Sequence, residues 1–521
     1  MHPRQRIVRI LLSISAVVFI SDASYAIPAF SRMYGTSCST CHVDFPKLND
    51  FGKAFKDAGF KFPKDDEGFI KVPPVMLGAP ANKELFPHTI WPGQIPGVPP
   101  IGLRYNHFFQ VVSQNRNSFN LQSPTDPAGQ QFIPRTDFQT GLFSIFTAGN
   151  FGSDIAFWVD DDISVSGANS NGGLGDAYLR FVNLSRLLKL PTDSVNLRVG
   201  QFELDLPFSQ ARSWNLSGWD IYSQANIGAA GVQNVNNAFA LSNAAQGVEI
   251  SGGHHYGGYQ YSLAIVNQNT GQPVGGGVGV SPQVAFTSDS NFKDLYARFQ
   301  YRFNLERDPA SRREIQAAGA TGPRDHTYLS LGTLYFYGRS VQRFAGQDTS
   351  GSGLVLTARE PFYRVGADFN FNYHALNLFG QFLYGRDQNL LPIMPSGATL
   401  PTGFATGSAA HFSGGFLEAD YVVYPWMVAI MRWDRVNSTA DMLSGVGADQ
   451  NAPPANSYFS PFSSVRNRYT PGIQFLIHAN IKTSFEYQIR PKQIVYAPGT
   501  NIPLTGAFRT NSAVVGLEFV Y

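Results

Sequence analysis

Cysteine is nearly absent from this chain, since Cys38 and Cys41 are the only two among 521 residues. A structural zinc site would need further Cys or His ligands at regular spacing, and none follow this pair. A redox-active dithiol would be expected near a β-α-β pattern, which the surrounding residues do not show. The two thiols therefore need a different chemical explanation.

Charge and long apolar runs are also scarce. Charged residues make up 15% of the chain and the net charge is only +2, without basic clusters, which argues against a nucleic-acid partner. Beyond residue 26 no run approaches the ~18 apolar residues of a membrane-spanning helix, so none is expected. Neither a GxGxxG nor a GxxxxGK pattern is present, so no nucleotide site is expected.

The chain is rich instead in short segments where apolar and polar residues alternate, with 51 glycines and 14% aromatic residues. In 481–489, Ile481 and Phe485 share one face, whereas Lys482 and Glu486 share the other. Such a period of two predicts a strand with one apolar face. Sixteen strands are predicted, near 103–112, 139–149, 152–161, 174–184, 194–203, 244–254, 257–267, 292–303, 326–338, 361–373, 375–386, 411–423, 425–436, 467–478, 480–490 and 511–521.

We expect a mainly β fold, in which these strands form a sixteen-stranded transmembrane β-barrel. The polar faces repeat Arg, Lys and Glu, which would be hard to pair inside a sandwich core. Short links alternate with long ones, as periplasmic turns and exterior loops do in such barrels. The long links are 113–138, 204–243, 304–325 and 387–410. A location in the cell outer membrane, in contact with its lipid, is therefore expected.

The start of the chain predicts export and a small separate unit. Residues 1–26 combine a basic beginning, an apolar stretch and small residues at the end, the pattern of a Sec-type signal peptide. Residues 27–62 are predicted to form a helical unit, because Phe and Leu recur at helical spacing from Phe45. Nine prolines make 63–102 an extended connector, and 103–521 form the barrel.

The motif Cys38-Ser39-Thr40-Cys41-His42 is the arrangement that attaches a c-type haem. The thiols of Cys38 and Cys41 add to the haem vinyl groups, and His42 becomes the proximal iron ligand. One covalent haem c per chain is therefore expected. Export fits this expectation, because such haems are attached outside the bacterial cytoplasm. A sixteen-stranded barrel is wide enough for the small helical unit that carries the haem, so this cytochrome c domain is expected inside the lumen.

Around this motif the chain resembles the fused monohaem cytochrome c–porin family of bacterial outer membranes, best known from iron oxidisers. The matching residues are Pro28-Ala29-Phe30, Arg32, Gly35, Cys38, Cys41, His42, Pro46, Leu48, Phe51-Gly52, Phe55-Lys56 and Gly59-Phe60. The barrel matches that family only in size, strand count and ending. The resemblance implies a cytochrome that plugs the porin and passes electrons from an extracellular donor, such as Fe(II), to a periplasmic c-type cytochrome or another soluble carrier.

The second axial ligand of the iron is open at this point. Met76 is the first choice, because it lies in an apolar segment after the helical unit and a thioether ligand would raise the haem potential. An open or water-ligated iron is the main alternative. The other candidates are Met33, His88 and His107. Carboxylates that suit Fe²⁺ are also present, although a solvated loop or lumen lining explains them equally. They are Asp160-Asp161-Asp162, Glu203 and Asp205.

Three functions are compatible with these features. The first is an electron conduit, which would be an oxidoreductase if it oxidises Fe(II) itself. The second is a diffusion porin whose haem plug serves only to stabilise or gate it. The third is a haem enzyme of the peroxidase type, which is disfavoured because no distinct distal His-Arg pair lies close to the haem motif in the sequence. A conduit needs a haem reachable from both sides, whereas a porin needs an open lumen.

Overall fold

The computed structural model describes most of the barrel and the haem motif. The described residues are 29–62, 66–76, 84–85, 88, 94–95, 97, 100–112, 136–152, 154–163, 173–209, 212–223, 241, 244–254, 257–267, 292–305, 327–347, 353–387, 410–438, 465–489 and 511–521. The predicted signal peptide, 1–26, and much of the predicted connector, 63–102, lie outside these ranges. Within them, no helix has the length and apolar character that a bilayer-crossing helix requires.

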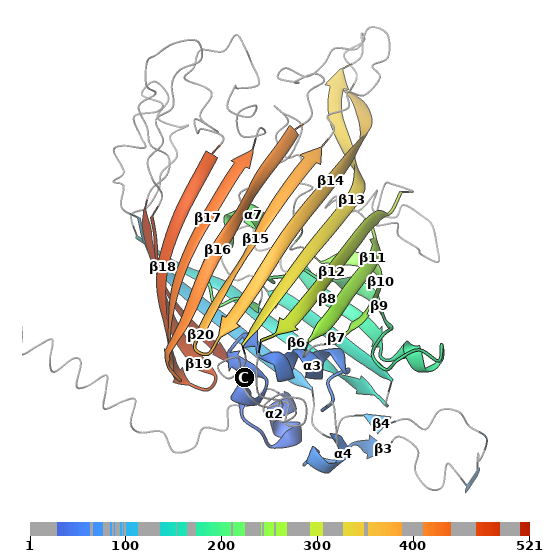
Figure 1. Ribbon diagram of the computed structural model, residues 1–521. Helices are drawn as coiled ribbons and strands as arrows, with labels where there is room; N and C mark the ends of the chain where they lie inside the picture. Colours follow the sequence, from blue (N-terminus) through green and yellow to red (C-terminus); the bar gives the residue numbers. More distant parts are fainter. Residues whose placement is uncertain are drawn as a thin grey trace, which may run out of the picture.

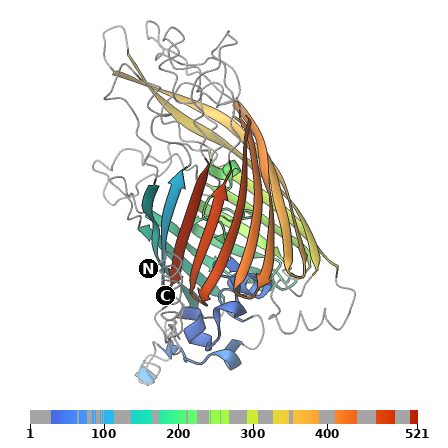
Figure 2. The same cartoon turned by 90° about the vertical axis from the view of Figure 1, so that its left-hand side faces the viewer.

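Sixteen antiparallel strands, β5 to β20, close into one barrel, which confirms the predicted fold (Figures 1 and 2). Each strand pairs with its neighbours along the chain, and β20 pairs with β5 to complete the ring. The strands are β5 Ile101–Val112, β6 Thr136–Phe151, β7 Ile155–Ile163, β8 Gly173–Phe181, β9 Asn196–Phe202, β10 Ala245–Gly253, β11 Gly258–Val266, β12 Asp294–Asn304, β13 Tyr328–Gln347, β14 Gly353–Tyr373, β15 Leu376–Asp387, β16 Ala410–Tyr424, β17 Met427–Ser438, β18 Val465–His478, β19 Ile481–Gln488 and β20 Ser512–Val520.

Strands β13 and β14 are longer than predicted. They stay paired from Tyr328↔Asn372 to Gln347↔Gly353, which extends the hairpin well past the predicted ends at 338 and 361. In 339–347 apolar and polar residues no longer alternate, because this part of the hairpin need not present one apolar face to lipid. A test for period two therefore misses it.

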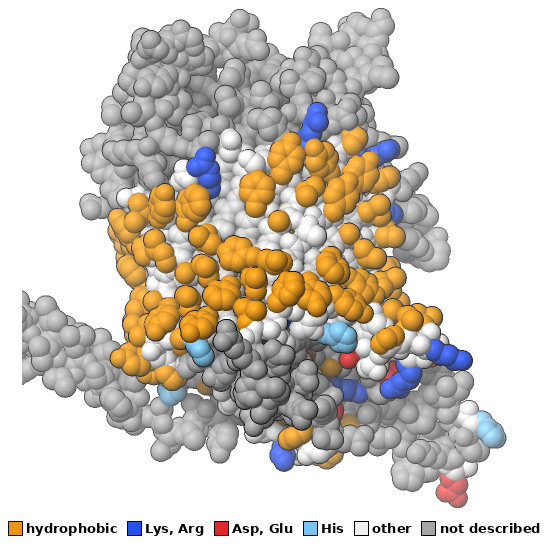
Figure 3. All heavy atoms as spheres, in the orientation of Figure 1, with side chains coloured by type: hydrophobic (Ala, Val, Ile, Leu, Met, Phe, Trp, Pro, Cys, Tyr) orange, Lys and Arg blue, Asp and Glu red, His pale blue; other side chains and the backbone are white. Residues whose placement is uncertain are grey.

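The two faces of the wall differ in chemistry as predicted. On β12, Leu295 and Phe299 are exposed on the outer face, whereas Arg298 and Arg302 are buried on the inner face. Figure 3 shows hydrophobic side chains covering the middle of the barrel's outer face, with the charged side chains of the described residues gathered towards its two ends. A closed barrel with such an outer belt spans a lipid bilayer, and this chain is an outer-membrane barrel.

Short turns mark the periplasmic end of the barrel, where β14–β15, β16–β17 and β18–β19 are each joined by two residues. The link 305–327, between β12 and β13, lies at the same end, because strands alternate in direction. Its prediction as an exterior loop was wrong, since the end of the barrel follows from strand order and not from loop length.

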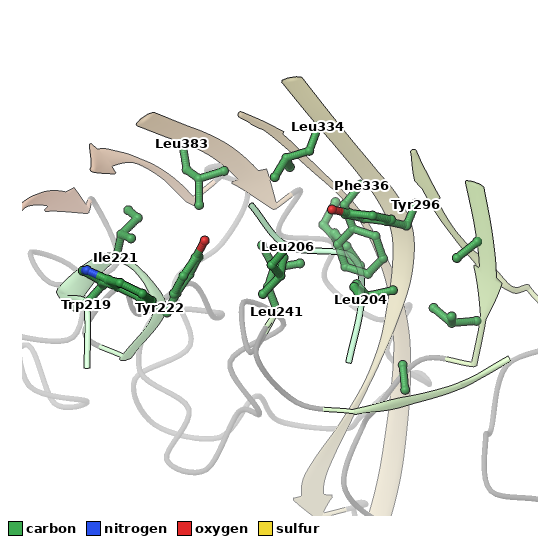
Figure 4. Packing of buried hydrophobic residues seen from close by; sticks show 14 of the residues in the cluster. Leu204, Leu206, Trp219, Ile221, Tyr222, Leu241, Tyr296, Leu334, Phe336 and Leu383 are labelled. Atoms are coloured by element: carbon green, nitrogen blue, oxygen red, sulfur yellow. The ribbon is translucent and has the colours of Figure 1, made fainter. Parts of the chain in front are cut away.

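The lumen contains an apolar core that strand alternation did not reveal. After β9 the chain turns back into the barrel, and a lumen segment, 203–209 and 212–223, packs against the inner wall and includes the short helix α7 (Asp220–Ser223). Figure 4 shows Trp219, Ile221 and Leu206 of this lumen segment among inward side chains such as Leu334 and Leu383. The barrel interior is therefore only partly polar.

The N-terminal unit, which was predicted inside the lumen, consists of short elements at the periplasmic mouth of the barrel (Figures 1 and 2). They are α2 Ala29–Tyr34, the 3-10 helix η1 Cys38–Thr40, β1 His42–Asp44, β2 Lys47–Leu48, α3 Asp50–Asp57, α4 Asp66–Phe69, β3 Val75–Met76 and β4 Gln94–Ile95. The predicted helix is shorter than its apolar pattern: Phe45 and Leu48 precede α3, which begins after the N-cap Asn49. Phe51 and Phe55 of α3 pack with Ala156 and Val182 of the barrel.

Candidate haem site at the periplasmic mouth

The two thiols of the motif lie one turn apart on and after η1, and neither forms a disulfide. Burial raises the pKa of the Cys38 thiol and raises the pKa of the Cys41 thiol to about 12. Redox-active dithiols depend on a lowered thiol pKa, so this environment disfavours the dithiol alternative. Cys41 also packs against the aromatic cluster of Tyr34 and Phe55, which would offer apolar contacts to a porphyrin.

His42 is held in the tautomer that an iron ligand needs. Its Nδ1 lies 3.3 Å from the carbonyl oxygen of Pro46, which accepts the Nδ1–H hydrogen bond and leaves the Nε2 lone pair for a metal. Burial lowers the pKa of His42 to about 4, against a smaller opposing effect of the Pro46 carbonyl, so the imidazole is neutral near pH 7. The free thiols and this oriented imidazole fit a covalently attached c-type haem.

Asn49 ties the motif to helix α3. Its Nδ2 donates to the carbonyl oxygens of Ser39 at 3.3 Å and Thr40 at 3.0 Å, and its backbone N–H donates to Cys41 O at 3.0 Å. Its Oδ1 accepts from the Gly52 N–H at 2.8 Å, which caps the helix. Asp44 or Asn49 could cap this helix on sequence grounds, and the structure uses Asn49; its contacts with the motif backbone could not be predicted.

Gly52 provides the close approach that this arrangement requires. A Cβ built on Gly52 would lie 2.0 Å from Cys41 O and 3.0 Å from a methyl carbon of Leu48. The obstacle on one side is backbone, which cannot rotate away as a side chain does. Any larger residue at position 52 must therefore push α3 and the motif apart.

We expect Gly52→Ala to lower covalent haem content and to destabilise the N-terminal unit, because overpacking a buried contact costs about 1–3 kcal/mol. Intact mass and haem absorbance measure the first effect, and protease resistance of 29–62 measures the second. Gly68→Ala is the matched control, since a Cβ there meets nothing within 4 Å. Equal haem content and equal resistance in both variants would contradict this account of the site.

Several polar contacts join the N-terminal unit to the inner wall. Asp50 pairs with Arg302 at 2.7 Å and Asp57 with Arg180 at 2.7 Å. In the β1–β2 ribbon, Lys47 pairs with Asp420 at 2.6 Å, and the Phe45 carbonyl accepts from Lys482 Nζ at 2.7 Å. The sequence carries no signal for these pairs, because each joins residues more than a hundred positions apart.

The four candidate distal ligands of the haem iron lie in different surroundings. The side chain of Met76 lies outside the described residues, so its role stays a prediction; its backbone pairs with Gln94. Met33 packs against the same aromatic cluster as Cys41. His107 pairs with Leu517 on the outer face of the wall and stacks near Phe138, so it points away from the motif. His88 is exposed.

The candidate iron-binding carboxylates do not converge. Asp160 accepts hydrogen bonds from Trp158 Nε1 at 2.6 Å and from the Asp176 N–H at 2.9 Å. Glu203 accepts from Ser209 Oγ. Asp161 is exposed, the side chain of Asp162 lies outside the described residues, and Asp205 belongs to the lumen segment. Over the described part of the chain, no three His, Cys, Asp or Glu side chains are grouped to hold a metal ion.

Comparison with known proteins gives similarity of the barrel only. No family model and no curated protein matches this chain. Solved structures similar to it include an anion-selective porin from Comamonas acidovorans, with 11% identity, a TM-score of 0.43, and coverage of 81% of this chain and 98% of that one. The outer membrane channel DcaP of Acinetobacter baumannii has 11% identity, a TM-score of 0.43, and coverage of 81% and 96%. Similarities this low carry no conclusion about what the barrel transports.

Proposed function

We propose that this outer-membrane barrel carries one covalent haem at its periplasmic mouth and passes electrons between an extracellular donor, such as Fe(II), and a soluble periplasmic carrier. The haem would supply a one-electron redox centre. The observation that carries the proposal is the His42 imidazole, oriented by Pro46 next to two free thiols in a unit seated on the barrel mouth.

The chain's own residues would hold this centre in place. Asn49 and Gly52 fix the backbone of the motif against α3. Arg302 and Lys482 of the wall fix the unit to the barrel. Tyr34 and Phe55 would keep water from one side of the bound group. A unit anchored in this way faces the lumen on one side and the periplasm on the other, as a conduit requires.

A diffusion porin with a structural or gating plug is the second candidate. Sixteen strands enclose the width at which known barrels leave an aqueous channel, and the inner wall bears many charged side chains. This alternative needs only what the barrel itself provides, whereas the conduit also needs the haem. The lumen segment favours the conduit, because its packing against the inner wall occupies part of the space that solutes would use.

Electron transfer into liposomes tests the proposal. Full-length protein is inserted into vesicles that contain a redox dye, and Fe(II) is supplied outside. We expect dye reduction with unchanged protein and none above the empty-vesicle rate with Cys38→Ala/Cys41→Ala, because no thioether bond can form. Haem content is measured by mass and absorbance on the same samples.

Cys38→Ser/Cys41→Ser serves as a second thiol-free variant, and conductance in planar bilayers separates the two functions. Dye reduction that continues without haem would overturn the conduit. A haem-loaded protein that conducts solutes freely and reduces no dye would establish the porin alternative.

A further inference from the structure

The connection 182–195, between β8 and β9, meets the wall at its last residues, directly before β9. The Gly253 N–H of β10 donates to Asp193 O at 3.1 Å, and Tyr261 Oη of β11 donates to Ser194 O at 2.7 Å. A Cβ on Gly252 would lie 2.0 Å from Ser194 O, so the two chains touch closely. The end of the connection therefore lies beside the periplasmic end of β10 and reaches the Tyr261 side chain of β11.

The face that it covers is the outer one. On β11, Ser262 is buried inward, so Tyr261 and Leu263 point outward, and Leu263 is exposed. On β10, Glu249 is buried inward, so Ile250 and Gly252 face outward. The connection thus touches the side of the wall that faces lipid. Figure 1 shows it in green, projecting sideways from the periplasmic end of the barrel.

The tip of the connection is both apolar and basic. Leu187, Leu188 and Leu190 are 78%, 60% and 48% exposed, and Arg186 and Lys189 between them are exposed as well. Ser185 fixes the backbone of this tip. It is fully buried, and its carbonyl oxygen accepts hydrogen bonds from the Leu188 and Leu190 N–H groups. The three leucines therefore point away from the protein on a fixed backbone.

The neighbouring outer face shows where the bilayer boundary lies beside the connection. Tyr259 and Tyr301 pair across β11 and β12 on the outer face, both exposed, at the periplasmic ends of their strands. Tyrosines in this position form the girdle where the bilayer core meets the head groups. The connection meets the wall near this level, where Asp193 and Ser194 contact Gly253 and Tyr261.

We propose that Leu187, Leu188 and Leu190 insert into the inner leaflet of the outer membrane, while Arg186 and Lys189 bind phospholipid phosphates. The leucine anchor, 186–190, would then fix the depth and tilt of this side of the barrel. A lipid partner is favoured over a protein because the anchor is continuous with the established lipid-facing belt, and because alternating leucine and basic residues suit the boundary between acyl chains and head groups. The inference does not depend on the haem.

Depth-dependent quenching tests the insertion. Leu188→Trp protein is placed in vesicles whose phosphatidylcholine is brominated near the head group or deep in the acyl chain, and the fluorescence of unchanged protein is subtracted. We expect strong quenching by the shallow bromines, weaker quenching by the deep ones, and protection from aqueous acrylamide. Phe69→Trp is the matched control, since Phe69 is exposed on α4 of the N-terminal unit and is expected to be reached by acrylamide only.

A side chain at 188 that acrylamide reaches and bromines do not quench would overturn the proposal. Protection without bromine quenching would also overturn it, in favour of a second copy of the chain or a periplasmic protein. Leu187→Trp repeats the measurement if the first variant does not fold.

Lipid retention tests the role of the two basic residues. Purified Arg186→Gln/Lys189→Gln protein should retain phosphatidylglycerol less well than unchanged protein, by roughly fivefold per charge. The control variant Lys71→Gln should retain it normally, and equal retention by the two variants would refute phosphate binding.

Discussion

Arg302→Met will release the N-terminal unit from the mouth of the barrel. Arg302 and Asp50 are 7% and 4% exposed and form an ion pair at 2.7 Å, and the guanidinium also lies over the Tyr328 ring. Removing one partner of a buried pair costs about 3–5 kcal/mol, because a charge is left in a low-dielectric site. The N-terminal unit is too small to compensate for such a loss from a core of its own.

Hydrogen exchange of 38–57 in detergent-solubilised protein measures this release. Protection should fall by roughly 100-fold, since each 1.4 kcal/mol is a factor of ten. Arg298→Met is the matched control, because Arg298 lies on the same strand with the same exposure but pairs with Asp368 of the wall. If residues 38–57 show equal protection from hydrogen exchange in both variants, the Arg302–Asp50 contact does not hold the unit.

The wall of the barrel was predictable from the sequence because its strands repeat one physical condition. Each strand must present apolar residues to lipid, so alternation located all sixteen to within a few residues in most cases. Where a strand does not have to face lipid, alternation does not predict it, as in the extension of β13 and β14. In β13 itself, Tyr335 faces lipid while Leu334 and Phe336 face inward, so both faces are apolar and the lumen core is hidden.

The sequence indicated the candidate site only at the residues whose spacing the proposed covalent attachment of haem would require. Cys38, Cys41 and His42 stand out because thioether attachment needs that motif. The carbonyl of Pro46 that orients His42 is a backbone group, which no residue type reveals. The pair Asp50–Arg302 joins residues 252 positions apart, and no local pattern specifies such a contact. Ion pairs between residues far apart in the sequence could therefore be identified only in the structure.

Glu486→Gln is expected to loosen the lumen segment and to raise the conductance of the barrel. The Glu486 carboxylate accepts hydrogen bonds from the Leu216 N–H at 2.6 Å, the Ser217 N–H at 3.2 Å and Ser217 Oγ at 2.6 Å. Hydrogen bonds to a charged group contribute about 1.5–3 kcal/mol each. An amide in its place turns one acceptor into a donor that faces a donor, so at least one bond is lost, and the remaining bonds weaken because the negative charge is gone.

Planar-bilayer recordings and limited proteolysis at 212–223 measure the outcome together. A loss of about 3 kcal/mol raises the population of the released segment by roughly 100-fold, which should give larger or more frequent open events and faster cleavage. Asp368→Asn is the control, since Asp368 is a buried wall carboxylate that pairs with Arg298. A rise in cleavage without any rise in conductance would show that the segment is held by Glu486 but does not close the lumen, and that some other part of the chain limits passage.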